Sequence, residues 1–507
     1  MSAALTMPRT SFRIDDLDAL GISITRLTSD SRSVQRGDTF VAYRGMQADG
    51  RNFIAQAVER GANAVIWEAQ EFEWNNEWHV PNLAVHDLRH QAGLIADRVY
   101  GHPSRKLWMV GVTGTNGKTS ISHWLARTYT ALGRKGAVLG TVGNGFPGTL
   151  QATMNTTPDA LIVHGLLAEY ERQGAQTVTM EVSSHALTQG RVNGVNFDVA
   201  LLTNLTRDHL DFHGDMQSYA AAKRRLFDWE KLKHAVLNLD DPFGADLAEQ
   251  LKDKPVEVIG YGLNRESLEL AERLGIRMVY GTLAQMDAQG LILQLHTSWG
   301  AAAMQSKLIG RFNASNLLGA LAVLLVGEID IDDAVRELGL QKAVAGRMQT
   351  LGGKDTPAVV VDYAHTPDAL EKVLNTLREV TEPSGGKVFC VFGCGGDRDR
   401  GKRPMMGTVA SKFADVRIVT SDNPRNEEPR EIINAIIAGM QGDFQVIEDR
   451  AKAITYAINK AQANDTVLLA GKGHEEYQEI KGERQPFSDS EIAHRVLSMW
   501  TPEERWL

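Results

Sequence analysis

The segment Gly111–Ser120, with the sequence GVTGTNGKTS, combines residue types that can bind a nucleotide triphosphate. The apolar run LWMV precedes it and an amphipathic segment follows it, so the order is strand, glycine-rich loop and helix. Lys118 adds a full positive charge at the start of the expected helix, and the Thr119 hydroxyl could bind a magnesium ion. The backbone N–H groups expected to surround a phosphate belong to Gly114, Thr115, Asn116 and Gly117.

The glycine spacing differs from the common P-loop pattern, because Val112 stands five positions before Gly117. The alternative is a glycine-rich turn with no ligand. The strand before the loop, the GKT triplet and the helix after it favour nucleotide binding over that alternative.

Candidate metal ligands follow two of the expected strands. Glu181 ends the run VTMEV, and His209 lies in TNLTRDHLDFHG. Magnesium prefers oxygen ligands, which suits Thr119 and Glu181 better than His209. By spacing alone, we favour a structural His209 that caps a helix or bonds a loop carbonyl, and Lys223 would be a solvated helix lysine.

Composition excludes several classes of protein. The 507 residues include 54 basic and 63 acidic side chains, a net charge of −9, so no broad positive field is available to hold nucleic acid. The two cysteines fit neither a disulfide framework nor a zinc site, and the N-terminus has no export signal. The best apolar run, 317–327, is shorter than the ~20 residues of a membrane span. We therefore expect a cytoplasmic protein without membrane insertion.

The strand-like runs fall into three sets, which predict an α/β protein of three domains. We place the domains at 1–105, 106–344 and 345–507. In the second and third sets, short apolar runs alternate with segments long enough for helices, which indicates a mostly parallel sheet. Polar residues follow the strands of the third set, at the sheet edge where ligands bind.

Twelve motifs in order resemble the Mur ligase family over nearly the whole chain. They are SDSRSVQRGDTFVA, GVTGTNGKTS, NTTPD, MEVSSHAL, TNLTRDHLDFHG, YAAAKRRLF, GRFNASNLLGAL, AGRMQ, VVVDYAHTPDALEK, FGCGGDRDRGKRP, SDNPRNEEPR and AGKGHEEYQ. The resemblance implies an N-terminal α/β UDP-binding domain, a central P-loop ATPase with a mostly parallel sheet, and a C-terminal Rossmann-like domain that binds the amino acid.

The resemblance also implies an activity. A ligase of this kind uses ATP to add meso-2,6-diaminopimelate to UDP-N-acetylmuramoyl-L-alanyl-D-glutamate through an acyl phosphate, releasing ADP and phosphate during peptidoglycan precursor synthesis. We expect a monomer whose partners are these small molecules and Mg²⁺.

Several residue roles come only from the resemblance. The implied catalytic and metal-binding residues are Lys118, Thr119, Glu181, His209 and Lys223, the last as a carbamate formed with carbon dioxide. The further implied ATP contacts are Asn313, Asn316, Arg347 and Asp362. The implied contacts to the UDP substrate are Ser31, Arg32, Thr156, Thr157, Ser184 and Arg191. Without the resemblance, Thr156 and Thr157 could equally cap a helix.

The implied diaminopimelate contacts are Arg398, Asp422, Asn423, Pro424, Arg425, Gly471 and Glu475. The planar Arg425 side chain suits the far carboxylate of diaminopimelate, and Glu475 suits its ammonium. We expect lysine, which lacks that carboxylate, to leave a buried Arg425 unpaired and to be rejected for this reason. The alternative is a simple turn with a surface arginine.

Four other functions agree with only part of the sequence. Folylpolyglutamate synthase shares the ATPase plan but lacks the UDP domain, and a lysine-adding ligase would turn over lysine as well as diaminopimelate. A nucleotide-controlled switch would hydrolyse ATP without an amide product, and no NKxD motif for guanine is present. A binding module without catalysis disagrees with the joint presence of phosphate, metal and acceptor motifs.

Overall fold

A computed structural model describes residues 13–45, 48–153, 155–287, 290–353 and 355–501, and the chain divides into two compact units. The first unit comprises Met1–Thr113, Tyr129–Ala200 and Ala222–Lys233, and the second comprises Gly114–Thr128, Leu201–Ala221 and His234–Leu507. The N-terminal residues 1–12, on which the expected absence of an export signal rests, lie outside the described residues. The boundaries placed at 105 and 344 stay predictions.

The first unit contains two groups of strands. The sheet β1-β2-β3-β4 is parallel throughout. In the other group β8 lies between β5 and β6 in parallel, and β7 pairs antiparallel with β6. Strands and helices of this unit are β1 (Leu27–Thr28), β2 (Thr39–Ala42), α1 (Ile54–Glu59), β3 (Ala64–Glu68), β4 (Asn82–Val85), α2 (Leu88–Val99), β5 (Trp108–Thr113), β6 (Gly136–Gly140), β7 (Gly143–Gly145), α4 (Ala160–Arg172), β8 (Thr177–Glu181) and α5 (Ser184–Thr188). Short 3₁₀ helices are η1 (Ile14–Leu20), η2 (Ser31–Ser33), η3 (Gly50–Phe53), η4 (Asn76–Trp78) and η5 (Pro103–Lys106).

Three elements have residues in both units: α3 (Lys118–Ala131), β9 (Val199–Leu202) and α7 (Met216–Arg224). The second unit continues with α6 (Leu210–His213), β10 (His234–Asn238), α8 (Pro242–Leu251), β11 (Glu257–Gly262), α9 (Arg265–Leu274), β12 (Arg277–Asp287), β13 (Gly290–Thr297), β14 (Gly300–Ser306), α10 (Arg311–Val326) and α11 (Ile331–Gly339). Strands β10, β11 and β12 are parallel, and β12, β13 and β14 are antiparallel. The apolar run noted in the sequence is the buried core helix α10.

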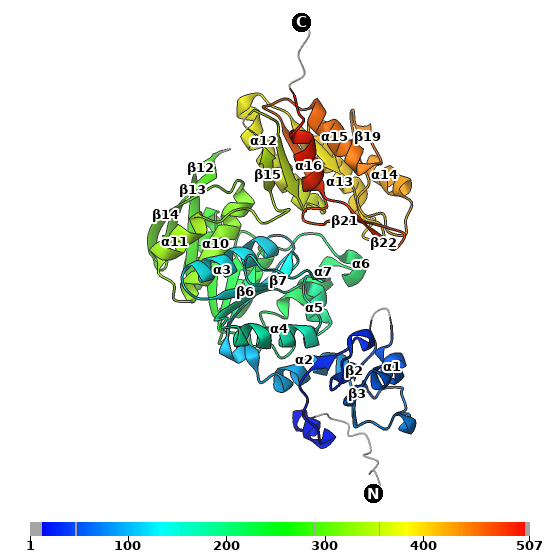
Figure 1. Cartoon of the computed structure of the whole chain (residues 1–507). Coiled ribbons are helices and arrows are strands. Elements are labelled where there is room, and N and C mark those ends of the chain that lie inside the picture. Colours follow the sequence, from blue (N-terminus) through cyan, green and yellow to red (C-terminus); the bar gives the residue numbers. More distant parts are fainter. Residues whose placement is uncertain (1–12, 46–47, 154, 288–289, 354, 502–507) are drawn as a thin grey trace. The chain divides into compact units, whose positions relative to one another are not determined.

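The C-terminal part of the second unit has a six-stranded sheet in the order β15-β16-β20-β17-β18-β19, parallel except for β15. Its elements are β15 (Gln349–Gly352), β16 (Ala358–Asp362), α12 (Pro367–Thr381), η6 (Glu382–Ser384), β17 (Val388–Phe392), α13 (Lys402–Phe413), β18 (Val416–Val419), α14 (Pro429–Ile437), β19 (Gln445–Val446), α15 (Arg450–Lys460), β20 (Thr466–Ala470), β21 (Tyr477–Ile480), β22 (Glu483–Pro486) and α16 (Asp489–Leu497). Figure 1 shows the helices around these strands, and β21 and β22 form a separate hairpin.

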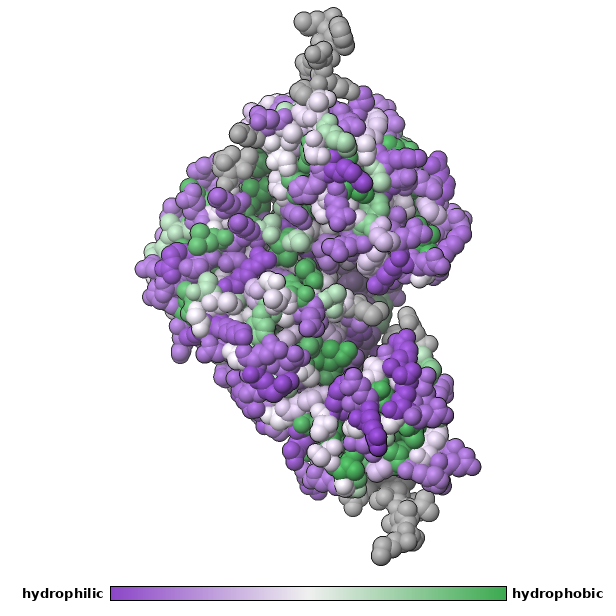
Figure 2. All heavy atoms as spheres, viewed as in Figure 1, coloured by the Kyte–Doolittle hydropathy of each residue, from purple (hydrophilic) through white to green (hydrophobic). Residues whose placement is uncertain are grey.

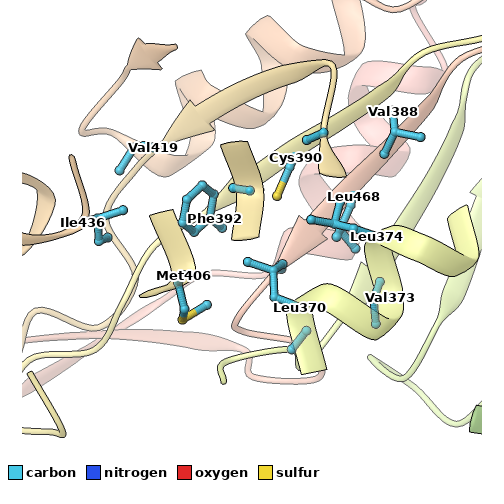
Figure 3. Close-up of a cluster of buried hydrophobic side chains, with 14 of the residues drawn as sticks. Leu370, Val373, Leu374, Val388, Cys390, Phe392, Met406, Val419, Ile436 and Leu468 are labelled. Carbon is cyan, nitrogen blue, oxygen red and sulfur yellow. The ribbon is translucent and has the colours of Figure 1, made fainter. Parts of the chain in front are cut away.

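Alternating strand residues bury both faces of this C-terminal sheet. Cys390 and Phe392 pack with residues of α12, α13 and α14, whereas Phe389 and Val391 pack with α15 and α16. Figure 3 shows the first of these clusters, with side chains of α12 around β17. A parallel sheet with helices on both faces confirms the predicted α/β class and the Rossmann-like C-terminal part.

A buried ion pair joins two helices of this C-terminal part. Arg450 and Asp489 are both fully buried, and the guanidinium donates to the carboxylate at 2.8 and 2.6 Å and to the Ala470 carbonyl at 2.9 Å. We expect Asp489→Ala to lower the free energy of unfolding by about 3–5 kcal/mol, because it leaves a buried charge without its partner. Urea denaturation checks this value. The matched control Glu269→Ala breaks an exposed pair with Arg265 and should cost less than about 1 kcal/mol.

The surface can be judged on the face that Figure 2 shows. Figure 2 shows hydrophilic side chains over most of the visible face, with small apolar patches between them. Of the helices in the described part of the chain, none combines the length and apolar character that a membrane crossing requires.

Candidate functional site

The glycine-rich loop joins β5 to α3 and needs glycine at two positions. Gly114 and Gly117 have φ values of +143° and +89°, which favour glycine. A Cβ atom at residue 114 would lie 1.8 Å from Oγ1 of Thr203, and one at residue 117 would lie 2.5 Å from Oδ1 of Asn316. Both glycines therefore permit a close approach of the loop to its neighbours.

Two of the loop N–H groups have protein acceptors. The Thr115 N–H donates to the backbone carbonyl of Asn204 at 2.9 Å, and the Asn116 N–H donates to the Asn204 side-chain oxygen at 3.0 Å. This corrects the expectation that both groups surround a phosphate. An anion can instead bind at the first turn of α3, because the backbone N–H groups there point out of the N-terminal end of the helix and have no partner within it.

Lys118 and Thr119 are oriented by neighbouring polar groups. The Lys118 ammonium donates to the carbonyl oxygens of Gly114 and Thr115 at 2.8 and 2.9 Å, which holds the charge over the loop. Arg347 donates to the Thr119 hydroxyl at 3.1 Å, and its guanidinium lies 4.4 Å from the centre of the Tyr363 ring. Two positive side chains, Lys118 of α3 and Arg347 from a distant segment, therefore lie at the start of this helix.

A cavity of about 470 Å³ lies beside this loop within the second unit, a volume typical of small-ligand sites. Six of the residues predicted to bind ATP line it: Asn116, Gly117, Asn313, Asn316, Arg347 and Asp362. Burial raises the pKa of Asp362, and its carboxylate accepts the Met348 N–H at 2.7 Å. The cavity is therefore lined by the glycine-rich loop and by amide and carboxylate side chains, which can form hydrogen bonds with a polar ligand.

A second cavity of about 180 Å³, also within the second unit, contains most of the residues predicted to bind the amine substrate. Its lining includes Arg398, Asp422, Asn423, Arg425, Gly471, Glu475 and His209. Pro424 is not among the lining residues. Tyr363 lines both cavities, so one side chain forms part of the wall of each.

The Arg425 side chain is largely buried and already has protein partners. It donates to the Gly396 carbonyl at 2.9 Å, and its Nε lies 3.4 Å from a carboxylate oxygen of Glu479. Its burial excludes the alternative of a surface arginine on a simple turn. However, the expectation that lysine would leave Arg425 unpaired is wrong, because Glu479 and Gly396 remain as partners.

Asp208, a possible metal ligand in the same sequence motif as His209, also lines the second cavity. Its carboxylate lies 3.4 Å from His209 and 3.6 Å from His365. Although burial acts to raise the pKa of Asp208, the two histidines and the Lys402 ammonium hold it well below its usual value. His209 directly precedes α6 with φ +55°, and its side chain does not cap that helix.

The remaining metal-site candidates Glu181 and Lys223 are in the first unit, and both are buried. Glu181 accepts hydrogen bonds from the Thr141 N–H and hydroxyl at 2.8 and 3.0 Å. Among the residues that the structure describes, no group of three or more His, Cys, Asp or Glu side chains forms a metal site.

The threonines predicted to contact the UDP substrate do not cap a helix. Asp159 caps α4, whereas the Thr157 hydroxyl donates to the Glu181 carbonyl at 2.8 Å. The Thr156 hydroxyl accepts from Thr141 at 3.0 Å, and Arg191 donates to the Thr157 carbonyl at 2.8 Å.

Three other predicted contacts of the UDP substrate lie in short helical segments of the first unit. Ser184, the first residue of α5, is buried. Ser31 donates to the Gln56 side chain at 2.6 Å, whereas Arg32 is exposed and pairs with Asp30 at 2.9 Å.

The chain matches the models of three domains in order. These are "Mur ligase family, catalytic domain" at residues 23–100, "Mur ligase middle domain" at 112–324 and "Mur ligase, glutamate ligase domain" at 346–473. The chain belongs to the Mur ligase family. The matches cover the residues of both cavities except Glu475, which lies two residues beyond the last match.

Other Mur ligases are similar over nearly their whole length. A UDP-N-acetylmuramoyl-L-alanyl-D-glutamate--2,6-diaminopimelate ligase of Chromobacterium violaceum is 53% identical over 489 residues, which is 96% of each chain. The ligase of the same name from Nitrosomonas europaea is 49% identical over 492 residues, covering 95% of this chain and 94% of the relative. A solved structure of a ligase with that name is 36% identical, with a TM-score of 0.65 over 94% of this chain and 95% of that one.

Two further residues of this Mur ligase contact predicted site residues and were missed in the sequence. Asn204 accepts hydrogen bonds from two backbone N–H groups of the glycine-rich loop. Lys472 contacts three side chains that line the second cavity. Asn204 follows β9 and Lys472 follows β20, so the polar residue just after a buried strand was a usable signal for both.

Proposed function

We propose that this Mur ligase uses ATP to join meso-2,6-diaminopimelate to UDP-N-acetylmuramoyl-L-alanyl-D-glutamate. The observation that carries this proposal is the second cavity, which combines arginines with Asp422 and Glu475. Such a site suits an amino acid with a carboxylate and an ammonium at its far end. The names of the relatives that are about half identical support the same substrate pair.

The reaction proceeds in two steps. A carboxylate oxygen of the UDP-linked substrate attacks the γ-phosphorus of ATP, giving an acyl phosphate and ADP. The unprotonated amine of diaminopimelate then attacks the acyl carbon, phosphate leaves with the bonding electrons, and the new amide nitrogen loses its extra proton. The cavity beside the glycine-rich loop is where we propose that ATP binds, with Lys118 and Arg347 balancing the negative charge of its phosphates.

The charge balance decides the first step. A carboxylate and a phosphate oxygen about 4 Å apart repel by about 4 kcal/mol at an effective dielectric constant of 20. Thr119 and His209 are the residues of the second unit that we propose as ligands for Mg²⁺, and Glu181 is a candidate ligand in the first unit. The oxygen donors among them suit that ion. When bound, Mg²⁺ would lower this repulsion further.

We also propose that Lys223 is carbamylated. Its side chain is 1% exposed, and a carbamate forms when a neutral lysine amine reacts with carbon dioxide. The carbamate would add an anionic oxygen ligand for a cation. A carbamate signal in ¹³C NMR after incubation with labelled bicarbonate, absent in Lys223→Ala, would support this modification.

A direct assay tests the proposed function. The chain is supplied with ATP, Mg²⁺ and the UDP-linked dipeptide, and ADP release and tripeptide formation are measured with diaminopimelate or lysine. We expect one ADP per amide bond with diaminopimelate and kcat/KM about 100-fold lower with lysine, since Arg425 keeps partners without a far carboxylate. ADP release without an amide product, or equal turnover of lysine, would contradict the proposal.

A further inference from the structure

Lys472 is a fully buried lysine directly behind the second cavity. It follows Gly471 at the end of β20, and its side chain has no exposed surface. Its ammonium donates to the Asn423 side-chain oxygen at 2.9 Å and to a carboxylate oxygen of Glu475 at 3.3 Å. A buried ammonium without partners destabilises the folded state, so Lys472 requires its contacts with Asn423 and Glu475.

The same ammonium lies near a second carboxylate. Its nitrogen is 3.7 Å from Oδ1 of Asp422, close enough for an ion pair but too far for a hydrogen bond. That oxygen is buried and has no hydrogen-bond partner among the described residues. Two carboxylates around one ammonium leave one negative charge uncompensated within this cluster. The cluster is therefore suited to one further cation.

Lys472 also fixes the orientation of the Asn423 amide. The Asn423 oxygen accepts from Lys472 and from the Glu479 N–H at 3.0 Å, so the amide nitrogen must face the other way. That nitrogen donates to the Glu475 carboxylate at 2.8 Å. Lys472 thus holds Glu475 both directly and through Asn423.

We infer that Lys472 is a positioning residue that orients Asp422, Asn423 and Glu475 to receive the single ammonium at the far end of the amino-acid substrate. The inference rests on the proposed function for the identity of that substrate. Lys472 is not among the residues lining the cavity, so it acts through the three side chains. Without its charge, the Asp422 and Glu475 carboxylates would repel each other and would no longer be held in place to receive the ligand ammonium.

The experiment compares steady-state kinetics of the full-length wild type, Lys472→Met and a control variant. We expect Lys472→Met to raise KM for diaminopimelate about 100-fold while KM for ATP and kcat at saturating diaminopimelate change less than about threefold. The control Lys452→Met removes an exposed lysine of α15 in the same part of the chain and should match the wild type. Circular dichroism and thermal unfolding verify that each variant is folded.

A double-mutant cycle separates positioning from a general loss of structure. Because Lys472 holds Glu475 both directly and through Asn423, adding Lys472→Met to Glu475→Gln should raise KM for diaminopimelate by much less than the about 100-fold expected in the wild-type background. The double variant also tests the inference if Lys472→Met alone fails to fold. Glu475→Gln removes one of the two carboxylates near residue 472, so the double variant has less uncompensated negative charge there. If both variants with Lys472→Met fail to fold, Lys472 is structural and the inference fails.

Two further results would overturn the inference. One is a folded Lys472→Met variant whose KM for diaminopimelate stays within about threefold of the wild type. The other is a double-mutant cycle in which the fold-increases in KM for Lys472→Met and for Glu475→Gln multiply in the double variant. Either result leaves the proposed function intact as long as the wild type forms the amide, whereas an inactive wild type would contradict the proposed function itself.

Discussion

Lys118→Ala is expected to lower kcat/KM for ATP about 1,000-fold, because the variant loses a full positive charge beside the phosphates. The estimate follows from about 4 kcal/mol for one pair of unit charges 4 Å apart at an effective dielectric constant of 20, with about 1.4 kcal/mol for each tenfold change in rate. The ammonium is held over the loop by the Gly114 and Thr115 carbonyls, so its position is defined before a ligand binds.

The measurement is amide formation with ATP concentration varied, together with calorimetric binding of ADP. Loss of both ADP affinity and turnover would place the Lys118 charge in ground-state binding, whereas loss of turnover alone would place it in the transition state. Lys252→Ala, which removes an exposed lysine at the end of α8, is the control. A folded Lys118→Ala variant within tenfold of the wild-type rate would remove Lys118 from phosphate stabilisation.

Arg425→Ala is expected to raise KM for diaminopimelate about 100-fold, since it removes the guanidinium proposed to bind the far carboxylate. Turnover of lysine should change much less, because lysine has no group for this guanidinium to bind. The variant therefore narrows the preference for diaminopimelate over lysine. Kinetics with each amino acid varied at saturating ATP and UDP-linked dipeptide would measure both effects.

Arg430→Ala is the matched control for Arg425→Ala, because Arg430 is an exposed arginine five residues further along the chain. Its kinetic constants should equal those of the wild type. Glu479→Gln offers a complementary test, since it removes the anion that lies 3.4 Å from Arg425 and should strengthen carboxylate binding. Unchanged preference for diaminopimelate in Arg425→Ala would exclude the contact with the far carboxylate.

The sequence predicted the glycine-rich loop well because its requirements are local. Strand, loop and helix are adjacent in the chain, and Gly114 and Gly117 adopt positive φ values that other residues rarely adopt. The sequence also predicted that the polar residues after buried strands lie together, because parallel strands bring their carboxyl ends to one edge of a sheet. The resemblance to the Mur ligase family then identified Arg425 and Glu475 as candidate contacts among the residues that follow these strands.

The partners of these residues were not predictable from the sequence. Thr115 and Asn116 are bonded by Asn204, nearly ninety residues further along the chain, and the separation between Lys472 and Asn423 is 49 residues. Such contacts depend on strand order and on the path of loops, which no local pattern encodes. The pairing of Arg425 with Glu479 was missed for the same reason, although it determines how strongly lysine is rejected.

The sequence alone was enough to predict the family, the α/β class, the glycine-rich loop and seven of the residues that line the second cavity, because its motifs are defined by residue type and short-range spacing. Only the tertiary structure decided which of these groups have protein partners and which buried charges stay uncompensated. The physical reason is that the strength of a charge or hydrogen bond depends on burial and on neighbours in space. Lys472 illustrates this, since Asp422, one of the two carboxylates near its ammonium, lies in a distant segment of the chain.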